Sequence, residues 1–273
     1  MARPQASAAV RPGARIPGAL AGRVLEHWLR QYRGTWRAGL FSGFLAPLLY
    51  LGSLGFGLGS LVDAGSRGGV EGVRYAAFVA PGVLAATAMQ AAIGEATYPV
   101  MGAILWQRLY LGMLATPLGV LDVLFGHLSF IAVRLTVVSV AFALVGTALG
   151  AFGSWWVIVA AAIAVLCGLA HAAPVMAFAA RQESDQNFAL IFRFVMVPMF
   201  LFAGTFFPVD QLPVGLRVVA RLTPLWHATQ ASRDLLLGRA DALGVLAHVA
   251  YLLAWVGVGT ALAARSYRSR LIR

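Results

Sequence analysis

Residues 155–178 read WWVIVAAAIAVLCGLAHAAPVMAF, a run without Asp, Glu, Lys or Arg. A hydrocarbon core about 30 Å thick is crossed by about 20 apolar helical residues, so this run is long enough to span a membrane. Similar apolar stretches are expected to cross at 40–61, 76–98, 121–149, 189–207 and 243–264. The sequence therefore predicts an all-α polytopic membrane protein, with a transmembrane domain of six helices over residues 38–264.

The composition also indicates a membrane protein. Hydrophobic residues make up 60% of the chain and charged residues 11%, against about 45–50% and about 25% in soluble domains. The net charge of +11 comes from arginines that flank apolar segments. Anionic lipid headgroups are therefore the expected counter-charge, and no nucleic acid partner is expected. The single cysteine, Cys167, excludes an intrachain disulfide.

Every one of the 21 basic residues is arginine. A P-loop binds nucleotide phosphates through a lysine, so this chain has no conventional ATPase site and any ATP-driven work requires another polypeptide. Zincin and nucleophile-elbow motifs are absent from the sequence, and its histidines lack metal-ligand spacing. We therefore expect no catalytic residue, no metal and no cofactor bound by this chain.

The arginines also predict the orientation. Thirteen of them fall in one alternate set of flanks and loops and six in the other. Because arginine is enriched on the cytoplasmic side, both termini are expected in the cytoplasm of a multi-pass protein of the inner or plasma membrane. Residues 1–19 are interpreted as a disordered cytoplasmic tail, with an organelle transit peptide as the alternative, and residues 265–273 as a second cytoplasmic tail.

Residues 20–37 have the periodicity of an amphipathic helix. Apolar side chains recur from Ala21 through Trp28 to Trp36 at helical spacing, and Arg30 and Arg33 lie on the opposite face. Such a helix is expected in the membrane interface, with its apolar face in the acyl boundary. It is either a simple anchor or a lever between a cytoplasmic partner and the first span.

The segment between spans 2 and 3, about 100–116, is too apolar for a solvated loop, and Arg108 and the flanking prolines make it a poor span. We expect a short helix from Trp106 to Leu114. Its exposed Arg108 and Tyr110 would enter a groove of a partner protein. The alternative is a re-entrant turn packed on the bundle.

The segment after span 5 combines aromatic residues with prolines. It is interpreted as a re-entrant hairpin of two short helices, about 204–225, with Asp210 as a helix N-cap and Phe206 and Phe207 near the membrane surface. The two phenylalanines either line a substrate exit or are ordinary interfacial aromatics.

Ionisable residues inside predicted spans are functional candidates, and three of them are Glu95, Arg134 and His248 of span 6. Glu95 lies near the end of span 2 and Arg134 within span 3. An ion pair between them would lower the cost of burying both charges and lock the two spans together. A proton relay is the alternative role.

The sequence also resembles a known family. The resemblance covers about residues 20–270. It rests on FVAPG at 78–82, Glu95, ATPL at 115–118, LFAGTFFPVDQLP at 201–213, RLTPL at 221–225 and Arg233. These motifs are similar to those of permease subunits of type-2 ATP-binding-cassette (ABC) exporters, above all the nodulation-factor (lipo-oligosaccharide) and drug-resistance branch. The resemblance implies a connecting helix at 20–37, a coupling helix at about 100–116 and re-entrant helices after span 5.

The same resemblance implies partners and a mechanism. Two permeases, identical or related, would each receive a separate nucleotide-binding subunit that carries ATP and Mg²⁺. The complex would move an amphipathic substrate outward by alternating access, either a lipid-linked saccharide or a hydrophobic drug. An ion-coupled secondary transporter and a membrane enzyme acting on lipid-linked substrates are the alternatives.

Three groups of residues are the resulting candidates. Coupling to the ATPase is assigned to Trp106, Arg108, Leu109, Tyr110 and Met113. The connecting helix contributes Trp28, Arg30 and Arg33. The substrate pathway or its exit is assigned to Phe44, Tyr50, Phe78, Phe202, Phe206 and Phe207.

Overall fold

The computed structural model describes residues 18–34, 37, 45, 48–65 and 69–272. Within these ranges every named element is helical, and the only β pairing is an isolated bridge between Val70 and Val73. The predicted all-α class is confirmed. The tail at 1–19, apart from Gly18 and Ala19, and most of the first half of the first predicted span lie outside the described residues.

Among the described residues, five helices are long and apolar enough to cross a membrane. They are Leu48–Gly65 (including η1, Leu51–Leu58, and α3, Gly59–Gly65), Tyr75–Leu105 (α4, Tyr75–Ala96, and α5, Tyr98–Leu105), α7 (Val120–Ala148), α8 (Val157–Ala179) and α13 (Ala242–Leu271). The fifth predicted span is a shorter apolar helix, Gln186–Phe202 (α9, Gln186–Leu190, η2, Ile191–Met196, and α10, Val197–Phe202). Each predicted span therefore corresponds to an apolar helix.

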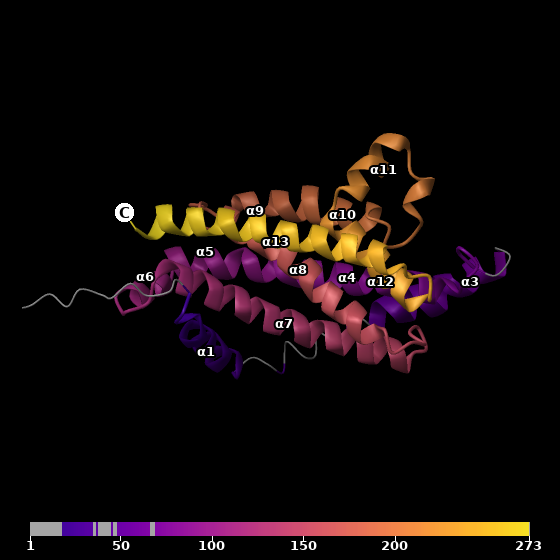
Figure 1. Cartoon of the computed structure of the whole chain (residues 1–273), viewed down its shortest axis with the longest axis horizontal. Coiled ribbons are helices and arrows are strands. Elements are labelled where there is room, and N and C mark those ends of the chain that lie inside the picture. The colour runs from indigo at the N-terminus through magenta and orange to yellow at the C-terminus, as the bar shows by residue number, and fades with distance from the viewer. Residues whose placement is uncertain (1–17, 35–36, 38–44, 46–47, 66–68, 273) are drawn as a thin grey trace, which may run out of the picture.

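Helix α8 is the centre of the bundle. It packs against α4, α7, α13 and also α12 (Pro224–Leu236), and these long helices run side by side (Figure 1). Helices α1 (Ala21–Tyr32) and α6 (Leu109–Leu114) and the C-terminus lie at one end of the bundle, which we call the α6 end. Helix α11 (Val214–Arg221) and α3 lie at the opposite end, the α11 end. Helix α1 and the end of α13 thus lie at the same end of the bundle. A chain that starts and finishes on one side of a membrane crosses that membrane an even number of times.

The second span continues further than predicted. Helix α4 ends at Ala96, Thr97 takes φ −96° and ψ −95°, and α5 then runs to Leu105. Pro99 lies in the first turn of α5, where a backbone N–H would have no partner within the helix, so its absence there carries no energetic cost. In α4 the same residue would remove a helical hydrogen bond, so α4 ends before it. The Thr97 hydroxyl donates to the carbonyls of Ile93 (3.0 Å) and Gly94 (3.2 Å). The proline therefore separates the spanning helix from the segment that leads to α6.

Helix α1 is shorter than the predicted 20–37 and packs against another helix. Its periodicity identifies the buried face correctly, since Val24 and Trp28 are 1% and 7% exposed. That face packs on α7, a neighbour that the periodicity does not indicate. Gly126 of α7 permits the contact, because a Cβ there would lie 2.4 Å from the Cβ of Val24. Asp122 of α7 also accepts a hydrogen bond from the Leu20 backbone N–H at 2.8 Å.

The predicted hairpin at 204–225 is formed by α11 and the first part of α12, preceded by a 3₁₀ turn, η3 (Val209–Gln211). The assignment of Asp210 as a helix N-cap is wrong, because Pro213 holds that position in α11. Asp210 instead accepts a hydrogen bond from Arg221 at 2.8 Å. Helix α12 extends to Leu236 and packs against α4, α8 and α13, so it belongs to the bundle instead of a surface hairpin.

Candidate functional site

An exposed turn precedes α6 at the α6 end of the bundle. Trp106, Gln107 and Arg108 are exposed, and Trp106 keeps 64% of its surface accessible. Arg108 has φ 49°, a left-handed conformation uncommon for a residue with a side chain, and it caps α6. The helix predicted from Trp106 therefore begins three residues later, at Leu109, and its first three predicted residues form a protruding turn.

Tyr110 is not exposed, which corrects the prediction that it enters a partner's groove. It is fully buried, its hydroxyl is hydrogen-bonded to Nδ1 of His127 in α7, and its ring centroid lies 5.6 Å from that of Tyr267 in α13. Met113 is also buried and Leu109 is half-buried. The apolar side of α6 faces the bundle because α7 and α13 offer it aromatic partners.

The same histidine contacts α1. The ring of Trp28 stacks on His127 with a centroid distance of 4.3 Å and an interplanar angle of 19°. Trp28, Tyr110, His127 and Tyr267 thus form one buried group, which we call the aromatic cluster. It joins α1, α6, α7 and α13. Sequence reasoning missed His127 and Tyr267, since neither spacing nor periodicity indicates their contact with α6.

The remaining candidates on α1 are exposed. Arg30 pairs with Glu26 one turn earlier at 2.5 Å, and Arg33 is exposed at the end of the helix. An exposed pair at this spacing contributes only about 0.3–0.5 kcal/mol. The charged face of α1 is therefore free to contact lipid or another protein.

The predicted ion pair between spans 2 and 3 is formed. Arg134 of α7 lies 2.8 Å from Glu95 of α4, and their side chains are only 25% and 21% exposed. The Arg134 guanidinium also lies 4.7 Å from the centroid of the Tyr32 ring, at the end of α1. The pair consequently fixes α4, α7 and α1 relative to one another.

The pathway candidates do not form one surface. Phe44 lies outside the described residues, Phe202 is exposed and Phe207 is half-buried. The rings of Tyr50 and Phe206 both contact Phe200 edge-on, at centroid distances of 5.9 and 5.0 Å. Two predicted pathway residues from distant parts of the sequence therefore share a neighbour.

Phe78 is separate from that group because a cation covers it. The side chain of Phe78 is fully buried, and the guanidinium carbon of Arg233 lies 3.8 Å from the centroid of its ring. In this conformation Phe78 thus faces protein instead of a pathway.

Arg233 of α12 is 4% exposed. Its Nε donates to the Phe78 carbonyl (3.1 Å) and its Nη2 to the Gly204 carbonyl (2.7 Å). Burial lowers the pKa of Arg233 to about 10, so the side chain stays protonated at neutral pH. It joins α12 to the start of α4 and to the segment after α10. The sequence indicated Arg233 only as one of the residues that carry the family resemblance.

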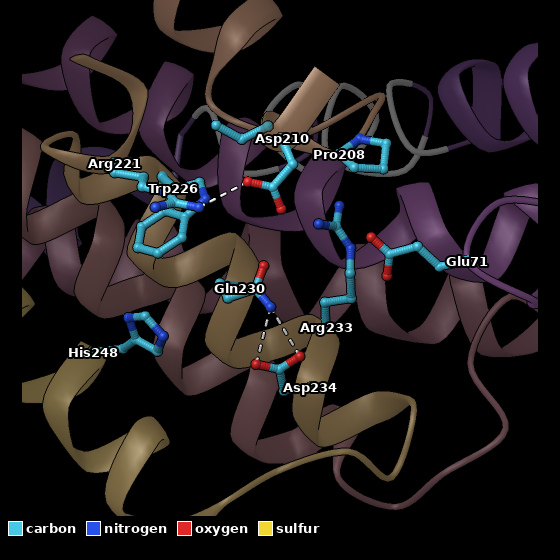
Figure 2. A pocket seen from close by; sticks show the side chains of 10 residues that line it. Glu71, Pro208, Asp210, Arg221, Trp226, Gln230, Arg233, Asp234 and His248 are labelled. Carbon is cyan, nitrogen blue, oxygen red and sulfur yellow. Dashed lines mark hydrogen bonds and ion pairs between the residues drawn. The ribbon is translucent and has the colours of Figure 1, made fainter. Parts of the chain in front are cut away.

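A polar cavity of about 340 Å³ lies beside Arg233 at the α11 end (Figure 2). Its walls come from the segment before α4, from η3, and from α11, α12 and α13. The lining residues are Glu71, Pro208, Val209, Asp210, Arg221, Trp226, Gln230, Arg233, Asp234 and His248. We call this cavity the polar pocket.

Two contacts inside the polar pocket fix its side chains. Arg221 donates to Asp210 at 2.8 Å, and the amide of Gln230 donates to both oxygens of Asp234 at 3.0 and 3.1 Å (Figure 2). The lining contains carboxylates, guanidinium groups and an amide, which are hydrogen-bonding groups that can hold a polar ligand.

Comparison with known proteins gives a consistent result. The sequence profile described as "ABC-2 type transporter" matches residues 24–237. The chain is 35% identical to nodulation protein J of Rhizobium leguminosarum bv. trifolii, over 90% of this chain and 93% of that protein. It is 32% identical to nodulation protein J of Rhizobium meliloti (strain 1021), over 90% and 92%. No solved structure matches the chain significantly.

The family explains why the chain has no P-loop. ABC-2 permeases are membrane-embedded transport subunits, and a separate subunit hydrolyses the ATP. The matched profile includes most of α1, the turn before α6, the Glu95–Arg134 pair and Arg233. This chain belongs to the ABC-2 type transporter family.

Proposed function

We propose that this chain is the permease of an exporter that moves an amphipathic, lipid-linked saccharide of the lipo-oligosaccharide type out of the cell by alternating access. The proposed substrate class comes from the relatives named nodulation protein J and from the resemblance of the sequence to lipo-oligosaccharide exporters. The arginine-rich flanks assign the α6 end to the cytoplasm and the α11 end to the outside. The membrane is then the inner or plasma membrane, with both termini cytoplasmic.

The energy for transport comes from ATP hydrolysis by partner subunits. Two copies of a nucleotide-binding subunit hold ATP and Mg²⁺, and each contacts one permease of a pair through the turn at Trp106 and Arg108. The two permeases are either copies of this chain or this chain with a related one. A partner can shift the permease between conformations only by binding one of them more tightly than the other.

The aromatic cluster is the observation that supports this function most strongly. Tyr110 lies two residues after the exposed Arg108, is buried against His127 and Tyr267, and through His127 reaches Trp28. A displacement of the exposed turn is therefore transmitted to α1, α7 and α13 together, because close-packed side chains do not deform independently. A surface loop without buried contacts would not do this.

The test uses the permease reconstituted with its ATPase subunit in lipid vesicles. The double variant Trp106→Ala, Arg108→Ala should insert normally, leave basal ATP hydrolysis by the partner intact, and reduce export at least tenfold. Arg268→Ala, an exposed arginine near the end of α13, is the matched control and should export normally.

Two results would contradict the proposal. Unchanged export by the double variant would remove the coupling role of the turn. Export that continued without the ATPase subunit and stopped when the proton gradient was collapsed would instead identify an ion-coupled transporter.

A further inference from the structure

We propose that the polar pocket binds the neutral oligosaccharide portion of the exported molecule at the outer end of its path. The inference rests on the proposed function for the direction of transport and the lipid-linked class of substrate. It adds a binding site that neither the family assignment nor the relatives' names provide.

The charges of the polar pocket select against charged ligands. Three carboxylates (Glu71, Asp210 and Asp234) and two guanidinium groups (Arg221 and Arg233) line the same small cavity. An anion would be repelled by the carboxylates and a cation by the guanidinium groups, and this repulsion offsets the attraction that either ion would find on the opposite charges. A neutral ligand with many hydroxyl groups can instead donate to the carboxylates and accept from the guanidinium groups.

The uncharged lining groups suit the same ligand. Trp226 lines the polar pocket and offers an aromatic surface, against which the C–H faces of a pyranose ring pack. Gln230 and Asp234 lie one turn apart on α12 and present paired polar atoms, the arrangement needed for adjacent sugar hydroxyls. A volume of about 340 Å³ is at the small end of ligand pockets, about 300–1,000 Å³.

The polar pocket is also preorganised. Arg233 holds α12 against Phe78 and Gly204, and the amide of Gln230 is held against Asp234. Rigid side chains lose little entropy on binding. Because the walls come from α11, α12, α13 and the segment before α4, a bound saccharide contacts four parts of the chain at once. Binding therefore favours one conformation of the α11 end.

The experiment measures saccharide binding by the full-length permease in lipid nanodiscs, without its ATPase partner, by isothermal titration calorimetry. The probes are the neutral tetrasaccharides cellotetraose, maltotetraose and N-acetylchitotetraose, with tetragalacturonate as the charged comparison. At least one neutral tetrasaccharide should bind, and tetragalacturonate should bind at least tenfold more weakly.

Gln230→Ala, Asp234→Asn and Trp226→Phe should each weaken that binding at least tenfold with unchanged thermal unfolding. Trp155→Ala, an exposed tryptophan outside the polar pocket, is the control and should bind as the wild type does. Absence of binding by every neutral probe, tighter binding of tetragalacturonate, or equal binding by all three pocket variants would overturn the inference.

The outcome is distinguishable from failure of the proposed function. Export without saccharide binding would overturn only the role of the polar pocket. Saccharide binding by a permease that exports nothing with its ATPase subunit would leave the pocket standing and remove the proposed function.

Discussion

Replacing Arg233 with methionine should destabilise the protein far more than removing any exposed arginine at the same end. Methionine keeps the apolar contact with Phe78 but removes the charge and both hydrogen bonds. The carbonyls of Phe78 and Gly204, which Arg233 contacts at 3.1 and 2.7 Å, then lose their donor in a buried region.

The magnitude follows from these contacts. A hydrogen bond to a charged group contributes about 1.5–3 kcal/mol, and a desolvated cation over an aromatic ring about 2 kcal/mol. Because such values are not additive and the desolvation of the guanidinium opposes them, we expect a loss of about 3–5 kcal/mol. Arg233→Lys, which keeps the charge but not the forked geometry, should lose roughly half of that. Arg221 and Asp210 have side chains 49% and 73% exposed, so Arg221→Met should cost less than about 1 kcal/mol.

The assay is reversible unfolding in mixed detergent micelles, followed by circular dichroism, for the wild type and the three variants. The ratio of the losses in unfolding free energy for Arg233→Met and Arg221→Met is the sharper test, because any influence of the micelle is common to both variants. Arg233→Met within about 1 kcal/mol of the wild type, or an Arg221→Met variant equally destabilised, would refute the assignment of Arg233 as the residue that holds α12 in place.

Three further predictions concern the α6 end. Glu95→Ala and Arg134→Ala should each destabilise the protein, while the double variant loses less than the sum. A double-mutant cycle in the same unfolding assay should give a coupling of about 0.5–3 kcal/mol, and a value near zero would contradict the ion pair. Gly126→Leu should push α1 off α7, because even a Cβ there would lie 2.4 Å from Val24. Trypsin should then cleave the chain faster after Arg23 and Arg30. The control is Gly153→Leu, where a Cβ meets nothing within 4 Å, and it should leave the cleavage rate unchanged. Tyr110→Phe removes only the hydroxyl that bonds His127 and should lower the export per ATP hydrolysed with normal insertion, so an unchanged ratio would show that this bond carries no coupling.

Much of the fold could be predicted from the sequence, because hydropathy reports the cost of placing each segment in lipid. Runs such as 155–178 reveal their spans without knowledge of their neighbours. The helical periodicity of residues 20–32 likewise identifies Val24 and Trp28 as buried. The ion pair of Glu95 and Arg134 could be predicted because a charged side chain in an apolar span has a high desolvation cost, and contact with an opposite charge lowers that cost.

The rest depended on tertiary contacts that a single sequence does not record. Periodicity shows that α1 has a buried face but not whether lipid or α7 covers it, and that choice depends on the missing side chain at Gly126. Tyr110 resembled an exposed aromatic residue because its partners, His127 and Tyr267, are far away in the sequence. The burial of Arg233 could not be predicted for the same reason, since its acceptors are main-chain carbonyls of distant residues.

The most direct test of the account is whether the turn before α6 touches the ATPase subunit. The chain has one cysteine, the buried Cys167, so a Cys167→Ser background allows a single reactive thiol to be placed by Trp106→Cys. In the assembled exporter, a short thiol-specific photo-crosslinker at residue 106 should join the permease to the nucleotide-binding subunit, and ATP should change the yield. The same crosslinker introduced by Trp155→Cys, at the opposite end, should give no such product. A crosslink to the ATPase subunit from residue 155 and none from residue 106 would contradict the account.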